Sequence, residues 1–592
     1  MRQKVFALID ATLQALKAAG TLKLEQVPGY TVEPPKNAAH GDWAVNVAML
    51  LTKPEGKPPR DLANAIVKGL VDKEGIVAKV EVAGPGFLNF TLKEQVIQQV
   101  AREVLSAGET FGRRAPKSTG KRIMVEFVSA NPTGPVHIGH ARGAFMGDAV
   151  ARLLDAAGHD VTREFYINDY GKQVETLGRT VHKRYRQLFG EQIELAEGEY
   201  PAEYVIDIAK TWRAEVGEKY LRAPESEWMP EAIAVAIREN LKAIKATLEK
   251  ANIRHDVFFS EASLHTSGKV VAIAGEYKKR GVTYEASEAR RDTEKVRSED
   301  SKAAQYTERQ KGGTFLVTSQ HGDDEDRVIL RHDGTPVYLT ADLAYHKEKY
   351  DRGFDRMIDV FGADHAGHVP RIKAGMILLG LDPKKLDFLL VQLVRITRGG
   401  EEVKVSKRKG TVFELADLID EVGPDVCRFL FLIKTANSRF DFDLDLVQKQ
   451  SKDNPVFYFQ YGHARCASIL KKAVEKGTPF VGAENLTQAQ LARLTLPEEL
   501  AMLKKMSQLP DVVASAAERL EPHHVLYFCQ ELITDFHSYY TKYKTDPIIS
   551  SDVEKTQGRL ALVAALKQTL RSAFALLGIN APEYMEAPPE EE

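Results

Sequence analysis

Two histidines three positions apart, His137 and His140, are the residues of this 592-residue chain most suggestive of chemistry. They end the segment KRIMVEFVSANPTGPVHIGH (121–140), which predicts an alternating apolar strand, a Gly/Pro turn and a helix start. A helix start presents free backbone N–H groups and a positive dipole end, and both favour phosphate. Gly139 lacks a side chain, so a flat ring could lie against the backbone there. The segment therefore predicts a nucleotide site on a helix that runs to Gly158.

A second candidate is the basic segment KVSKRKG (404–410), far downstream. It follows the apolar run from Phe388 to Ile396 and precedes a new element near Phe413. In an open α/β sheet, a loop after a strand lies in the crevice where ligands bind. Lysine amines there could follow the charge of a triphosphate as it passes to a leaving pyrophosphate. The alternative is a solvated basic surface.

The two motifs together, HIGH (137–140) and KVSKR (404–408), resemble the paired signature of class I aminoacyl-tRNA synthetases. Val405 and Arg408 stand where the class pattern has Met and Ser, but both lysines are kept. Longer blocks across nearly the whole chain resemble the arginyl-tRNA synthetases in particular. These blocks are HGDWAVNVAML (40–50), VEVAGPGFLNF (80–90), EFVSANPTGPVHIGHARGA (126–144), EFYINDYGKQV (164–174), VYLTADLAYH (337–346), DNPVFYFQYGHAR (453–465) and LLGINAPEYM (576–585).

The resemblance implies a ligase that joins L-arginine to tRNA(Arg) in two steps. The arginine carboxylate attacks the α-phosphorus of ATP to give arginyl-adenylate and pyrophosphate, and a terminal ribose hydroxyl of the tRNA then takes the arginyl group. The implied catalytic residues are His137, His140, Lys404 and Lys407. ATP is expected as a substrate with Mg²⁺ held mainly by phosphates and water, and a structural metal is not expected. The implied ATP-binding positions are Pro132, Thr133, Gly134, Pro135, Val136, Ile138, Gly139, Gly362, Asp364, His365, Val405 and Ser406.

A pocket for arginine must present carboxylates and other acceptors to a planar guanidinium that never loses its charge. The resemblance assigns this role to Glu126, Ser129, Asn131, Tyr338 and Asp342. Considered without the resemblance, two of these residues have other interpretations. Asp342 follows the strand-like Val337 to Thr340 and could be a helix N-cap, and Glu126 could be a salt-bridged strand residue.

Strands and helices alternate from Lys121 onward, which predicts a Rossmann-type parallel sheet in a multidomain α/β chain. The expected domains are a small α+β N-terminal domain (1–110), a catalytic domain (120–450) with an insertion at about 190–315, and an all-α domain (451–592). By resemblance the first contacts the tRNA elbow and the last binds the anticodon. The charge-rich segment 277–313 predicts an exposed excursion with little core.

Aromatic and basic residues recur in the helical C-terminal region, and Tyr458, Tyr461 and Arg465 are predicted to contact tRNA. Aromatic faces stack on splayed bases while basic groups bind phosphate. The alternative is an aromatic stripe that packs into the core.

The composition bears on RNA binding, on the cellular compartment and on membrane association. The net charge of −2 neither supports nor excludes RNA binding, because phosphate contacts need only local positive patches. The three cysteines are scattered, which favours a reducing cytoplasm and argues against disulfides and a cysteine zinc site. We expect no membrane association, because no apolar run approaches roughly 18 residues. The family suggests a monomer.

Two other functions stay open at this point. HIGH-type motifs also serve nucleotidyltransferases that act on small molecules, although such enzymes need no RNA-reading helical domain. A non-catalytic RNA-binding paralogue should show damaged signature residues, whereas His137, His140, Lys404 and Lys407 are all present.

Overall fold

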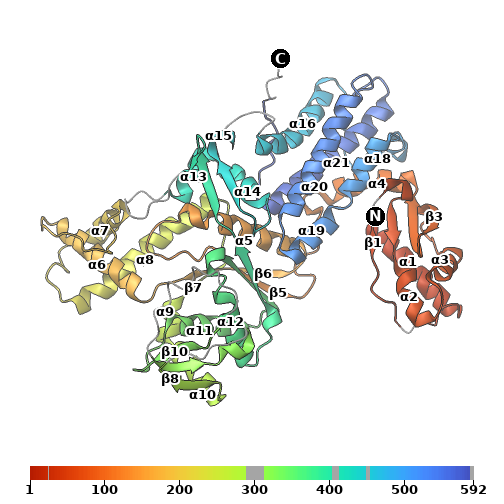
Figure 1. Ribbon diagram of the computed structural model, residues 1–592. Helices are drawn as coiled ribbons and strands as arrows, with labels where there is room; N and C mark the ends of the chain where they lie inside the picture. The colour runs from red at the N-terminus through yellow and green to blue at the C-terminus, as the bar shows by residue number, and fades with distance from the viewer. Residues whose placement is uncertain (24–25, 36, 288–311, 403–412, 448–453, 587–592) are drawn as a thin grey trace.

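The computed structural model describes residues 1–23, 26–35, 37–287, 312–402, 413–447 and 454–586. Figure 1 shows an α+β unit at the N-terminus, a central parallel sheet with helices, a helical projection beside it, and a C-terminal bundle of helices.

The central sheet is parallel, with the strand order β12-β11-β5-β6-β7. Its strands are β5 (Arg122–Glu126), β6 (Asp160–Ile167), β7 (Val257–Ser260), β11 (Arg356–Gly362) and β12 (Leu386–Val391). Because β7 falls inside the segment expected to be an insertion, part of that segment belongs to the main sheet.

The segment before the HIGH motif forms the buried strand that the sequence predicts, but the predicted alternation is wrong, since β5 is buried on both faces. Ile123 and Val125 belong to one apolar cluster and Met124 to another. Helix α5 (Ile138–Ala156) contributes to the first cluster, while α10 (Lys269–Lys279), α11 (Tyr338–Asp351) and α12 (His368–Leu378) contribute to the second. A parallel strand covered on both sides is apolar on both sides.

Two units are inserted between strands of the central sheet, one between β6 and β7 and the other between β7 and β11. Helices α6 (Lys172–Gln187), α7 (Glu203–Val216) and α8 (Glu225–Lys250) form the projection, and they enclose a separate core that includes Trp212 and Trp228. A three-stranded antiparallel sheet consists of β8 (Thr283–Ala286), β9 (Gly313–Leu316) and β10 (Arg327–Arg331), and the short α9 (Glu261–Thr266) follows β7.

The expectation that 277–313 is exposed with little core is wrong at its start. Tyr277 is fully buried on α10, and β8 pairs with β9. Apolar residues placed between the charged ones supply these contacts. Residues 288–311 lie outside the described residues.

A second small sheet, in the order β14-β13-β15, follows the central one. It comprises β13 (Val394–Arg398), β14 (Glu401–Glu402) and β15 (Phe440–Asp443), accompanied by α13 (Leu415–Val422), α14 (Pro424–Leu432) and α15 (Leu444–Val447).

The N-terminal unit has an antiparallel sheet in the order β1-β2-β4-β3 with helices against it. Its elements are α1 (Arg2–Ala18), β1 (Val32–Glu33), β2 (Trp43–Val45), α2 (Val47–Glu55), α3 (Pro59–Lys68), β3 (Val77–Ala83), β4 (Phe87–Leu92) and α4 (Glu94–Ala107).

The C-terminal unit is the expected helical bundle, so the predicted fold class is confirmed. Its helices are α16 (Pro455–Glu475), α17 (Gln488–Leu491), α18 (Pro497–Met506), α19 (Leu509–Arg519), α20 (His523–Lys542) and α21 (Val553–Leu577). Helix α21 begins at the cap Asp552, whose side chain accepts a hydrogen bond from Lys555 N, and ends at Gly578 with φ +72°.

One helix corrects the expectation about apolar length. By length and composition alone α21 could cross a membrane, but 78% of its apolar window is buried inside the protein. It is the central helix of the bundle, contacting α16, α17, α18 and α20. A helix that is apolar all round is what a bundle core requires.

Candidate active site

His137 and His140 form a compact pair at the start of α5, which opens where the sequence predicted a helix, with His137 as its N-cap. The backbone N–H of Gly139 donates to His137 Nδ1 at 3.1 Å, so the proton of the neutral ring lies on Nε2 and can be donated onward. The ring centroids of the two histidines are 3.9 Å apart. A Cβ on Gly139 would lie 2.9 Å from His137 Nδ1, so the ring that needs this glycine is the imidazole of His137 itself.

The chain returns to this motif just after the basic segment. Ile138 N donates to Phe413 O at 3.2 Å, and Leu415 N donates to Val136 O at 2.9 Å. The predicted meeting of the two distant motifs is therefore supported by the residues that follow the second one.

The basic segment itself, with Lys404, Val405, Ser406 and Lys407, lies outside the described residues.

The turn before α5 is held by the helical projection. Asn240 Nδ2 donates to Pro132 O at 2.9 Å, and the hydroxyl of Tyr204 donates to Thr133 O at 2.5 Å. A Cβ on Gly134 would lie 3.3 Å from the same hydroxyl. The projection thus fixes the backbone that is expected to face ATP.

Gly362, Asp364 and His365 lie at the same edge of the sheet as β5. Gly362 ends β11, which runs parallel to β5, and the carboxyl ends of parallel neighbours share an edge. Asp364 and His365 are both exposed, with 3.7 Å between a carboxylate oxygen and His365 Nε2. The structure therefore brings these three predicted ATP-site residues to the crevice edge.

Glu126, at the end of β5, is buried and already paired. Lys349, fully buried on α11, donates to Glu126 Oε2 at 2.5 Å and to Asp359 Oδ1 at 2.6 Å. Ser129 Oγ donates to Glu126 Oε1 at 2.8 Å. This network matches the alternative interpretation of Glu126 as a salt-bridged strand residue. Both oxygens of its carboxylate already accept hydrogen bonds from the protein.

Asp342 differs from Glu126 because its carboxylate has no hydrogen bond or ion pair with any described residue. It lies in the second turn of α11, which begins at Tyr338, so it is not the helix cap. Because residues 338–340 belong to this helix, the expectation that residues 337–340 form a strand is wrong. Burial, together with the nearby charge of Glu126, raises the pKa of Asp342 to about 6.

Glu261, the first residue of α9, is a second buried acid beside Asp342, and the sequence prediction missed it. Only 5% of the residue is exposed, and its one possible ion-pair partner among the described residues is His265, whose Nε2 lies 3.5 Å away and whose pKa is lowered by burial. Burial and the charges of Asp342 and Asp169 raise its pKa to about 7. Burial raises the pKa of the Tyr166 phenol, and the charges of Glu261 and Asp342 raise it further, so these three side chains lie near one another.

Two neighbouring acids that lack a Lys or Arg ion pair among the described residues could accept a cation between them. Glu261 escaped prediction because it lies directly after a short strand, in a segment without a motif. The signal available in the sequence was an acid at the end of a strand of a parallel sheet.

The other predicted arginine-site residues, Ser129, Asn131 and Tyr338, are half-buried or exposed. Val128 and Ser129 have φ of +72° and +39°, a strained backbone that turns the chain sharply after β5. Ser129 Oγ accepts from Tyr166 N at 3.1 Å, and Asn131 Nδ2 donates to Gln173 Oε1 at 3.2 Å. Tyr338 is 67% exposed, so its ring is not in contact with a packed pocket.

In the helical bundle, Tyr458, Tyr461 and Arg465 lie together on α16. The Arg465 guanidinium is 4.9 Å from the ring centroid of Tyr461 and 5.3 Å from that of Tyr540 on α20. Tyr458 packs edge-on against His537, with 5.0 Å between centroids.

Further along the same two helices is a cavity of about 270 Å³ whose lining includes Lys472, Lys476, Tyr540, Tyr543 and Lys544. This face of the bundle thus combines half-exposed aromatic rings with cations, so it is not a purely core stripe.

Comparisons with known proteins agree over almost the whole length. The chain matches the family models "Arginyl tRNA synthetase N terminal domain" over residues 6–92, "tRNA synthetases class I (R), catalytic domain" over 101–438 and "DALR anticodon binding domain" over 459–585. This chain belongs to the arginyl-tRNA synthetase family.

Relatives in the family are similar from end to end. An arginine–tRNA ligase of Anaeromyxobacter sp. (strain Fw109-5) is 44% identical over 572 residues, covering 94% of both chains. The corresponding ligase of Syntrophotalea carbinolica is 43% identical over 594 residues, covering 99% of this chain and 100% of its own.

Solved structures agree as well. A putative arginyl-tRNA synthetase from Campylobacter jejuni superposes with a TM-score of 0.71 at 30% identity, covering 83% of this chain and 100% of its own. The Thermus thermophilus arginyl-tRNA synthetase superposes with a TM-score of 0.68 over 99% of this chain and 100% of its own, and at 22% identity that likeness supports the fold.

Proposed function

We propose that this protein ligates L-arginine to tRNA(Arg), using ATP to form arginyl-adenylate and then transferring the arginyl group to the terminal ribose of the tRNA. The observation that carries the proposal is the pair of neighbouring acids, half-buried Asp342 and buried Glu261, which have no Lys or Arg ion pair among the described residues of a chain of this family. Such a pair needs a cation, and a guanidinium keeps its charge at every physiological pH.

Within this proposal, Asp342 and Glu261 bind the guanidinium, and the Tyr166 hydroxyl adds a polar contact. Ser129, Asn131 and Tyr338 remain proposed contacts at the rim. Glu126 acts through its contacts with Ser129 and Lys349, which shape the turn after β5. A lysine substrate would leave acceptors unpaired in this buried space, so the pocket should reject it strongly.

The ATP half of the site uses the start of α5. His137 and His140 donate to phosphate oxygens at the helix N-terminus, and the backbone of residues 132–136 lies along the nucleotide. Gly362, Asp364 and His365 border it, and Lys404 and Lys407, with Val405 and Ser406 between them, neutralise the departing pyrophosphate. Magnesium enters with ATP and is held mainly by its phosphates and by water.

Because no covalent enzyme intermediate is formed, the rate comes from positioning the arginine carboxylate against the α-phosphorus and from stabilising the charge of the leaving group. The Nε2–H of His137, whose tautomer is set by the Gly139 N–H, is poised for that second task.

The tRNA would bind across the domains. Tyr461 and Arg465, with Tyr458 beside them, and the lysine-rich cavity on α16 and α20 suit bases and phosphates of the anticodon arm. The N-terminal unit would contact the tRNA elbow. We further propose the boundaries 1–110, 120–450 and 451–592, a monomer, and a cytoplasmic location without membrane association.

The test is arginine-dependent exchange of pyrophosphate into ATP, measured for each amino acid with and without tRNA. We expect exchange with arginine alone among the amino acids, and only when tRNA is present. Exchange that is independent of tRNA with a different small acid would instead indicate a nucleotidyltransferase, and absence of exchange would indicate a non-catalytic paralogue.

The matched variants are His140→Ala and His321→Ala, the latter an exposed histidine outside the motif. The first should lower exchange by on the order of 100-fold or more, while tRNA binding stays close to that of the unaltered protein. Exchange that survives His140→Ala would remove this residue from the mechanism.

A further inference from the structure

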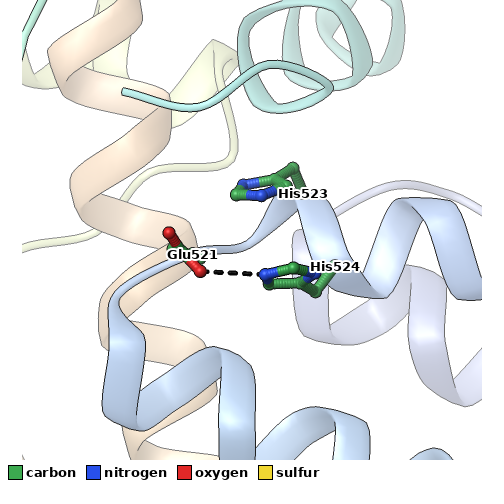
Figure 2. Close-up of side chains that lie close together, drawn as sticks. All are labelled: Glu521, His523 and His524. Carbon is green, nitrogen blue, oxygen red and sulfur yellow. Dashed lines mark hydrogen bonds and ion pairs between the residues drawn. The ribbon is translucent and has the colours of Figure 1, made fainter. Parts of the chain in front are cut away.

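Three ligand-type side chains meet at the turn between α19 and α20, outside the proposed active site. Glu521, His523 and His524 each present one ligand atom, and these atoms all lie within 4.8 Å of one another. Figure 2 shows the two imidazoles side by side at the start of α20 with the Glu521 carboxylate beside His524. No other such group of three His, Cys, Asp or Glu side chains occurs in the described part of the chain.

Two of the three side chains already interact. His524 Nε2 and Glu521 Oε2 are 2.8 Å apart, and the ring centroids of His523 and His524 are 4.3 Å apart. The side chains of Glu521 and His524 are 37% and 40% exposed, so both can reorient and a cation can enter from solvent.

His523 supplies the independent observation. It is 95% buried, being only 5% exposed, yet neither ring nitrogen has a hydrogen bond to any described residue. A ring that packing already holds in place loses little conformational entropy when one of its nitrogens binds an ion, which suits it to be a metal ligand. Its ring nitrogen is instead directed into the group formed with Glu521 and His524.

We propose that Glu521, His523 and His524 bind a late first-row divalent cation, represented by Zn²⁺, through one carboxylate oxygen and two imidazole nitrogens. Tetrahedral zinc with ligands at about 2.0–2.1 Å places its donor atoms roughly 3.3 Å apart. The present spread therefore closes by small rotations of the two half-exposed side chains. Water completes the coordination.

The donor set selects the class of ion. Imidazole nitrogens suit Zn²⁺, Ni²⁺ and Cu²⁺, whereas Mg²⁺ and Ca²⁺ prefer a full set of oxygens. The positive end of the α20 dipole opposes a cation, and the Glu521 carboxylate offsets it.

The proposed metal site lies where the helical bundle meets the central domain. Helix α19 packs on α5, the helix that carries the HIGH motif, and Tyr527 on α20 donates to Ile433 O, just after α14, at 2.9 Å. An ion at Glu521 would clamp the α19–α20 turn where the bundle meets the central domain. Bound ion should therefore raise the unfolding temperature by mass action.

The experiment uses the full-length protein without an affinity tag, stripped with a chelator and titrated with Zn²⁺ by calorimetry and with Co²⁺ by visible absorption. We expect one tight equivalent, Co²⁺ bands typical of nitrogen coordination, and a thermal midpoint that rises with Zn²⁺. Glu521→Gln and His524→Gln should each weaken binding by at least about tenfold and abolish the thermal shift.

His321→Gln is the matched control, because it removes an exposed histidine elsewhere and should leave binding unchanged. Glu521→Gln and His524→Gln alter half-exposed side chains and are expected to fold, whereas His523→Ala could also disturb packing. Zn²⁺ heats and Co²⁺ spectra that are the same in Glu521→Gln, His524→Gln and the unaltered protein would overturn the proposal.

Discussion

At the scale of single residues, what distinguishes Asp342 and Glu261 from the other buried acids near the crevice is the absence of a balancing cation. Glu126 and Asp359 share Lys349, and Glu164 pairs with Arg352 at 2.9 Å. Asp342 and Glu261 instead have pKa values raised to about 6 and about 7. The protein therefore keeps two carboxyl groups that a cationic substrate would complete.

This arrangement predicts that arginine binding is coupled to proton release. Near pH 6 the free pocket carries protons on these acids, and a guanidinium favours their ionised forms, so binding must expel protons. Arginine affinity should rise as the pH increases through 6 and 7 and then level off. Calorimetry at pH 6 in two buffers of different ionisation enthalpy measures the released protons directly.

Asp342→Asn is the control for that prediction. It should weaken arginine binding by on the order of 10- to 100-fold, since a charge-assisted hydrogen bond is worth about 1.5–3 kcal/mol. The raised pKa means that ionised Asp342 opposes folding above about pH 6, so the variant should be no less stable at pH 8. Affinity that is independent of pH, or a variant that binds arginine normally, would contradict the assignment.

Motif residues were predictable from the sequence at this scale, and pocket residues only in part. His137 and His140 are recognisable because they lie beside each other in the chain at a helix start. Glu261 and Lys349 act through contacts with residues roughly 80 to 220 positions away, and neither lies in a recognisable motif. Glu126 pairs with Lys349, and because Lys349 lies in no motif, the sequence could offer this salt bridge only as an alternative interpretation.

At the scale of elements, helix α11 contributes both to the proposed guanidinium site and to the buried ion-pair network. Asp342 near its start faces the proposed guanidinium site, and Lys349, seven residues on, joins it to β5 and β11 through Glu126 and Asp359. His346 reinforces the contact, with 2.8 Å between Nε2 and Asp359 Oδ2. The position of the pocket carboxylate therefore depends on an ion-pair network in the core.

We predict that Lys349→Met destabilises the protein by about 3–5 kcal/mol, because it leaves two buried carboxylates without their cation. Thermal unfolding monitored by circular dichroism measures the loss. Lys347→Met on the same helix is the matched control. Lys347 pairs with Asp351 near the surface at 2.7 Å, and its removal should cost less than about 1 kcal/mol. Equal stabilities for the two variants would show that the buried network contributes little.

The first turn of α11 shows why an element could be misassigned from sequence. Val337, Tyr338 and Thr340 have strand-forming side chains, and local propensity favours a strand. In the structure the Thr340 hydroxyl donates to Ile329 O at 2.5 Å, and the turn is helical. A long-range contact to β10 therefore decides the conformation. The bundle helices, with long apolar periods, were predictable as helices.

At the scale of the whole molecule, Arg428 joins three parts of the chain. It is fully buried on α14 and contacts Asp148 of α5 at 2.7 Å. Its other donors reach Ala251 O at 2.9 Å, after α8, and Leu577 O at 3.1 Å, at the end of α21. One guanidinium thus connects the HIGH helix, the end of the projection and the last helix of the bundle.

Arg428→Met should destabilise the protein by about 3–5 kcal/mol, since Asp148 and several carbonyl groups lose a buried partner. Melting should also become less cooperative as the bundle separates from the central domain. Differential scanning calorimetry measures both effects. Arg571→Met is the control, because Arg571 lies 3.8 Å from Glu109 at the surface and should contribute little. A single sharp transition at an unchanged temperature would exclude this role for Arg428.

The largest apolar cluster runs without interruption from Val5 of the first helix, through Phe145 of the HIGH helix, to Ile579 after the last helix. Helix α4 lies against α18 and α21, so even the N-terminal unit is continuous with the bundle. Cutting the polypeptide at any of its domain borders would expose apolar surface on both fragments. A shortened version should thus precipitate or need a chaperone, and recombining such pieces among relatives would require matched surfaces on each side of the cut.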